Sequence, residues 1–225
     1  ISLWIFIAVS LLQFGSGHGH AVQVANTQPA KMAAFEALWE SQEGAPMSII
    51  GMPDPSQKKT HFEIAVPKLL SFAINFDPDS RVQGLDEIPE DEQPPIVITY
   101  LTYHGMIGLG SFFALMAVIS AFLIITGKLE NARWFLWVLV FTVPLPFIAN
   151  ELGWMAAEIG RQPWAVYKVL RTADAASVVV PAWQILLSII AFSVIYLLLF
   201  AVFLKLLFGI IRKGPDKTTL GYVGE

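Results

Sequence analysis

The chain has 225 residues, of which 55% are hydrophobic and only 14% are charged, and its mean hydropathy is +0.60. Soluble domains carry about 25% charged residues, so this composition excludes an ordinary solvated domain and a disordered chain. The net charge of −4 argues against a nucleic-acid partner, and the lack of cysteine excludes disulfides and thiolate metal sites. We therefore expect a protein of the lipid membrane.

The first segment, residues 1–16, is apolar but short for a membrane span, and we interpret it as a truncated transmembrane helix. Because the chain opens at Ile1 inside this apolar run, we expect either missing upstream residues or processing. Residues 17–95 are more polar and form one long loop. Within it, residues 31–40 have helical composition and residues 44–60 are predicted to be irregular because they contain three prolines.

Three further spans follow this loop. Residues 96–127 and 175–211 each contain more than the roughly 20 apolar residues that a membrane helix requires. Residues 134–159 form another, in which Pro144 and Pro146 are expected to kink the helix. The predicted fold class is an all-α integral membrane protein with about four transmembrane helices and one long extracytoplasmic loop.

Basic residues in the short connections predict the orientation. Lys128 and Arg133 lie in one connection and three more basic residues lie in residues 212–225, whereas residues 160–174 carry three. This asymmetry favours a cytoplasmic C-terminal tail. Residues 160–174 and the long loop then lie outside the cytoplasm.

Ionisable side chains within the span 134–159 indicate function, because charges are costly in a bilayer. At about 100° per residue, one helical stripe collects Glu151, Trp154, Glu158 and Arg161. Two interpretations are open. Glu158 and Arg161 form a structural ion pair, or the carboxylate binds a metal centre while Arg161 neutralises an anionic group of the ligand.

The start of span 96–127 is rich in small residues, which allow close approach of a helix or a flat ring. Within it, Met106 is either a core side chain or a thioether ligand of haem. His104 lies about 200° around the helix from Met106, so the two cannot serve one metal face. We interpret His104 as a satisfied polar group or as a partner for an anionic ligand. His18 and His20, in a Gly-rich stretch, are only a weak indication of a metal site.

Three ordered blocks of sequence resemble subunit I of the cytochrome bd oxidases. The first runs from Gly17 to Trp39 and includes Gln28-Pro29-Ala30-Lys31-Met32-Ala33-Ala34. The second comprises Gly84-Leu85-Asp86, Pro94-Pro95 and Met106-Ile107-Gly108-Leu109-Gly110. The third comprises Gly153-Trp154-Met155-Ala156-Ala157-Glu158, Gly160-Arg161-Gln162-Pro163-Trp164 and Leu170-Arg171-Thr172-Ala173-Asp174. The resemblance covers roughly the last four of the family's nine spans, so the chain is expected to be a split subunit or a fragment.

The resemblance implies a quinol:dioxygen oxidoreductase that reduces dioxygen to water with electrogenic proton uptake. Its cofactors are a low-spin haem b, a high-spin haem b, and either haem d or a third haem b. Met106 matches the methionine ligand of the low-spin haem and Glu158 the carboxylate ligand of the high-spin haem. Trp154 matches a tryptophan between haems, and Arg161 an arginine near haem propionates.

The same resemblance assigns the quinol to the long loop, where Lys31 and Glu36 match residues implicated in quinol oxidation and Gln28 lies in the same motif. His104 departs from the family, which usually has arginine there. The loop is also the family's short form, and His20 stands where the family commonly has glutamine.

The expected partners are a polypeptide carrying the missing N-terminal spans of subunit I, a subunit II-like membrane subunit, quinol and the lipid membrane. The expected location is the bacterial or archaeal cytoplasmic membrane, and the chain is not expected to be active alone. Two alternatives stay open: a relative fed by cytochrome c or another non-quinol donor, and a non-catalytic membrane scaffold.

Overall fold

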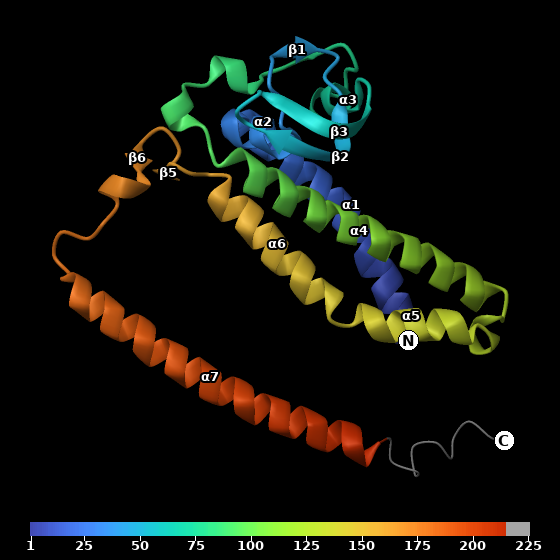
Figure 1. Cartoon of the computed structure of the whole chain (residues 1–225). Coiled ribbons are helices and arrows are strands. Elements are labelled where there is room, and N and C mark those ends of the chain that lie inside the picture. Colours follow the sequence, from blue (N-terminus) through green and yellow to red (C-terminus); the bar gives the residue numbers. More distant parts are fainter. Residues whose placement is uncertain (215–225) are drawn as a thin grey trace. The chain divides into compact units, whose positions relative to one another are not determined.

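The computed structural model describes residues 1–214 and divides into two compact units, residues 1–175 and the residues from 176 onward (Figure 1). In the first unit, three long helices pack together through α1–α4 and α4–α6 contacts. They are α1 (Ser2–Thr27), α4 (Ile96–Ile125) and α6 (Leu145–Ile159). In the second unit, α7 (Ala182–Lys213) is a single helix. Part of the expected cytoplasmic tail, including Lys217, lies outside the described residues.

Two helices of residues 1–214, α4 and α7, are long and apolar enough to cross a membrane. A third candidate is the pair formed by α5 (Arg133–Thr142) and α6, which is bent by 41° at a break containing Pro144. Proline removes a backbone donor and clashes with the preceding turn, so the bend falls where the sequence predicts a kink. The helix α1 is not among these candidates, and it continues to Thr27, beyond the expected end at residue 16.

The long loop is more structured than expected. Residues 44–60 were predicted to be irregular, and this prediction is wrong, because β2 (Met47–Asp54) and β3 (Lys59–Val66) form an antiparallel hairpin. Its prolines do not interrupt the pairing: Pro46 precedes β2, Pro53 lies near its end, and Pro55 lies in the turn. Proline is tolerated at the edge of a ladder and at its ends, where no neighbouring strand needs its N–H.

Short elements complete the first unit. Three two-stranded sheets, β1–β4, β2–β3 and β5–β6, depart from the expected all-α class, although the chain remains mostly helical. The remaining elements are α2 (Pro29–Glu36), β1 (Gln42–Glu43), α3 (Leu69–Asn75), β4 (Arg81–Val82), η1 (Leu85–Glu87), η2 (Glu90–Glu92), η3 (Leu129–Asn131), β5 (Trp164–Val166), β6 (Leu170–Arg171) and η4 (Thr172–Asp174).

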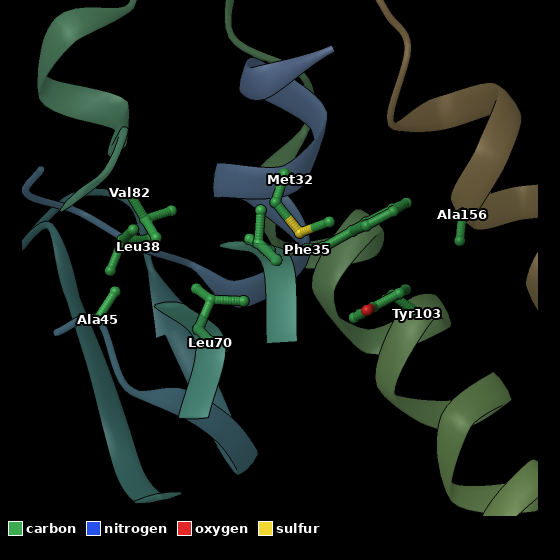
Figure 2. Packing of buried hydrophobic residues seen from close by; sticks show 9 residues of the cluster. Met32, Phe35, Leu38, Ala45, Leu70, Val82, Tyr103 and Ala156 are labelled. Atoms are coloured by element: carbon green, nitrogen blue, oxygen red, sulfur yellow. The ribbon is translucent and has the colours of Figure 1, made fainter. Parts of the chain in front are cut away.

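A buried apolar cluster holds the loop against the long helices (Figure 2). Met32 and Phe35 of α2, Leu70 of α3, Tyr103 of α4 and Ala156 of α6 belong to it. The Phe35 and Tyr103 rings stack with centroids 4.1 Å apart and planes 3° apart. Burial of such side chains contributes about 1.5–3 kcal/mol each. The cluster therefore sets α2 firmly against the start of α4 and the end of α6.

Candidate functional site

The helix α2 places a buried carboxyl group beside α4. Glu36 is 4% exposed, and its Oε2 accepts a hydrogen bond of 3.0 Å from the backbone N–H of Ser48 on β2. Burial raises the pKa of Glu36 to about 8; the Ser48 hydrogen bond opposes this shift, and the nearby charge of Glu63 adds to it. A carboxyl group with a pKa near neutral pH is suited to accept and release protons.

Lys31 lies one turn earlier on α2 and is also buried, with 7% of its surface exposed. Burial lowers the pKa of Lys31, the positive charge of Arg161 lowers it further, and Glu158 raises it. Gly160 makes room for this side chain, since a Cβ atom there would lie 3.2 Å from Lys31 Cγ and 3.1 Å from Thr99 Cγ2. The structure therefore brings Lys31 of the long loop to the end of α6.

Gln28 is the N-cap residue that directly precedes α2. Its backbone carbonyl accepts hydrogen bonds from the N–H groups of Lys31, at 3.0 Å, and Met32, at 3.2 Å. Pro29 at the first helical position needs no acceptor, because it has no N–H. The Gln28-Pro29 pair thus sets the start of the helix that carries Lys31 and Glu36.

At the end of α6, Glu158 and Arg161 form an ion pair through Oε2 and Nη2, and their side chains are 39% and 42% exposed. Two buried donors nearby, Arg161 Nε and Trp164 Nε1, have no hydrogen-bond partner within residues 1–214. Trp154 is 61% exposed and Glu151 is exposed as well. The structural ion pair predicted as one interpretation is present.

The helices α4 and α6 interlock where Met106 lies. A Cβ atom at Gly153 would lie 2.8 Å from Met106 Sδ, and one at Gly105 would lie 3.0 Å from Leu152 Cδ1. Each helix thus accommodates a side chain of the other over a glycine. Met106 is partly buried and packs against the apolar cluster that contains Phe35 and Tyr103.

His104 points away from Met106 and toward the loop. Its Nε2 lies 2.9 Å from the Ser48 carbonyl oxygen, its Nδ1 lies 3.0 Å from the Tyr100 carbonyl oxygen, and its ring stacks on the Tyr100 ring at 3.9 Å. A neutral imidazole carries one N–H and donates to one of these two carbonyl oxygens, whereas the doubly protonated ring donates to both. Sequence reasoning missed Ser48 and Tyr100, because Ser48 lies in the hairpin that was taken for irregular loop and Tyr100 belongs to no motif.

The donor set fits haem in chemical type. The thioether of Met106 and the carboxylate of Glu158 lie on packed helices, and Arg161 Nε and Trp164 Nε1 are N–H donors of the kind that bind propionates. Within residues 1–214, no group of three or more histidine, aspartate and glutamate side chains could hold a metal ion. His18 and His20 therefore gain no support as a metal site.

Packed helices that are long and apolar enough to cross a membrane define an integral membrane protein. The match to known proteins is more specific. Residues 1–215 match the family model of cytochrome bd terminal oxidase subunit I, and the chain belongs to this family.

The chain is 35% identical over 211 residues to cytochrome bd ubiquinol oxidase subunit 1 of Bacillus subtilis, a match that covers 89% of this chain and 45% of that protein. It is 25% identical to cytochrome bd-II ubiquinol oxidase subunit 1 of Escherichia coli, covering 89% of this chain and 52% of the relative. The bd oxidase structure from Geobacillus thermodenitrificans aligns with a TM-score of 0.74 and 28% identity, covering 93% of this chain and 48% of that one. The chain thus spans about half the length of these relatives.

Proposed function

We propose that the chain acts within a bd-type respiratory oxidase, where it oxidises quinol at α2 and helps to pass the electrons to dioxygen. The buried carboxyl group of Glu36 is the observation that carries this proposal. Oxidation of a quinol releases two electrons and two protons, and a carboxyl group with a pKa near 8 accepts one of those protons when it is deprotonated and releases it again. Lys31 and Gln28 complete the quinol-binding segment.

The residues of the two packed helices support a role toward haem. Met106 is suited to a low-spin haem b and Glu158 to a high-spin haem b, with haem d or a third haem b as a further cofactor. When bound, these groups supply one-electron transfer and the site of oxygen reduction. Arg161 and Trp164 supply the unpartnered N–H donors that bind anionic propionates, and Trp154 lies on the same exposed stripe as Glu158.

The chain spans about half the length of its relatives. We propose that the N-terminal spans of subunit I, on this or a partner polypeptide, complete the haem sites, together with a subunit II-like membrane subunit. We further propose that the complex lies in a bacterial or archaeal cytoplasmic membrane with the C-terminus in the cytoplasm. The quinol segment then lies on the outer side, and proton uptake from the inner side makes turnover electrogenic.

The test is oxidation of duroquinol by the assembled complex, compared with oxidation of reduced cytochrome c. Lys31→Ala and Glu36→Ala are expected to slow duroquinol oxidation by at least tenfold, while electrons from an artificial donor still reach oxygen. The matched controls are Lys58→Ala and Glu90→Ala, whose side chains are 70% and 85% exposed and pair with each other at 3.6 Å. Parental duroquinol rates in both loop variants, or a clear preference for cytochrome c, would refute the proposed donor.

A further inference from the structure

One buried residue of the hairpin uses three of its polar groups to join the loop to α4. Ser48 is 4% exposed. Its N–H donates to Glu36 Oε2 at 3.0 Å, its hydroxyl shares a hydrogen bond of 2.7 Å with the Tyr100 hydroxyl, and its carbonyl oxygen lies 2.9 Å from His104 Nε2. A single residue thus connects the carboxyl group on α2 with two side chains on α4.

The α4 side of this junction is rigid. Tyr100 is 1% exposed, and its ring stacks on His104 with an interplanar angle of 24°. The hairpin approaches Tyr100 closely because Gly51 has no side chain. A Cβ atom there would lie 2.9 Å from the Tyr100 hydroxyl and 2.5 Å from Thr60 Cγ2.

We propose that Tyr100 and His104 are positioning residues for quinol oxidation, because they hold Ser48 so that its N–H points at the Glu36 carboxylate. This inference rests on the proposed role of Glu36. It extends that role by naming the residues outside α2 on which the carboxylate depends. Here His104 acts through its hydrogen bond to the Ser48 backbone.

The charged and titratable groups packed near Glu36 come from β3 and from α4, where His104 contacts the Ser48 carbonyl oxygen. Glu63 of β3 is the charged neighbour, and its charge raises the pKa of Glu36. The α4 side presents the phenols of Tyr100 and Tyr103, and Glu36 contributes to the electrostatic environment of both. Against burial and Glu63, the Ser48 N–H is the contact that favours the carboxylate.

The direction in which the pH dependence of quinol oxidation should shift follows from the proton transfer to Glu36. Glu36 accepts a proton from quinol only as a carboxylate, so the rate of quinol oxidation rises with pH through the pKa of Glu36. If Ser48 loses its support, its N–H is held less well and the pKa of Glu36 rises further. Tyr100→Phe should therefore shift the rising limb to higher pH by about 0.5–1 unit, which lowers the rate at pH 7 by roughly three- to tenfold.

The experiment measures duroquinol oxidation against pH in the assembled complex for Tyr100→Phe, Ser48→Ala and Ser48→Thr. Tyr100→Phe and Ser48→Ala are expected to shift the rising part of the pH–rate profile to higher pH. Ser48→Thr keeps a hydroxyl and is expected to retain most of the parental profile. Tyr196→Phe on α7 is the matched control, since Tyr196 is 65% exposed. A second measurement needs no turnover: infrared titration of the carboxyl band that Glu36→Gln removes should show the same shift.

The outcomes separate the inference from the proposed function. If Glu36→Gln oxidises duroquinol at the parental rate, the proposed role of Glu36 fails, and the inference fails with it. If Glu36→Gln loses activity while Tyr100→Phe and Ser48→Ala keep the parental pH profile and infrared titration, only the positioning role is overturned.

Discussion

The two ends of the candidate site differ in how completely this chain satisfies their polar groups. Around Glu36, the carboxyl group, the Ser48 backbone, the Tyr100 hydroxyl and the His104 ring all have partners within the first unit. Around Glu158, the ion pair with Arg161 is about 40% exposed, and two buried N–H donors have no partner in the described part of the chain. The difference teaches that the polar groups around Glu36 are satisfied within this chain, whereas two buried donors near Glu158 have no partner in the described residues.

The largest expected effect is at the α6 side, where Glu158→Gln removes the negative charge with little change of shape. We expect selective loss or alteration of the high-spin haem b spectrum and a sharp fall in oxygen reduction, with the low-spin haem intact. An ion pair this exposed is worth only about 0–1 kcal/mol, so a purely structural role predicts a small loss of stability and full haem content. Full haem content and oxidase activity in Glu158→Gln with Arg161→Gln would contradict the ligand role.

The second prediction concerns Met106, which packs over Gly153 of α6. Met106→Leu keeps a similar volume over Gly153 but removes the sulfur, so packing should cost less than about 1.5 kcal/mol. We expect the reduced α-band of the low-spin haem to shift or disappear in an optical spectrum of the complex. An unchanged spectrum in a folded variant would leave Met106 as a core side chain.

The third prediction concerns Glu36 and the dependence of the stability of the fold on pH. The pKa of Glu36 in the folded protein is about 8, above its ordinary value of 4.5. A carboxyl group with a raised pKa stabilises the fold at low pH, and this contribution falls as pH rises from 4.5 toward 8, by up to about 1.4 kcal/mol per unit. Glu36→Gln should flatten this slope in thermal unfolding of the complex. An equally steep slope in the variant would place the titrating group elsewhere.

The smallest expected effect is at Gly51, where the hairpin meets α4. Gly51→Ala places a methyl group 2.5 Å from Thr60 Cγ2, so the hairpin must shift at a cost of about 1–3 kcal/mol. Gly209→Ala is the control, because nothing lies within 4 Å of a Cβ atom there. A thermal midpoint lowered only in Gly51→Ala would show that close packing of the hairpin on α4 stabilises the surroundings of Glu36. Equal midpoints in both variants would show that this packing is unimportant.

The apolar segments and the proline break were predictable from the sequence, because span length and proline geometry are local properties. The Glu158–Arg161 contact was predictable too, since residues three apart share a helix face. The Ser48 junction was not, because its partners lie 12, 52 and 56 residues away and no periodic pattern marks them. The proximity of Lys31 to the end of α6 likewise depends on tertiary packing.

The glycine interlock of α4 and α6 has a consequence for electron tunnelling, whose rate falls steeply with distance. Leu152 lies over Gly105 and Met106 lies over Gly153, so sliding one helix along the other by one residue, a rise of about 1.5 Å, would move both side chains off the glycines that accommodate them. The relative height of Met106 and Glu158 is therefore set by helix packing rather than by a loop. Any two redox centres held by these side chains would keep a constant tunnelling distance.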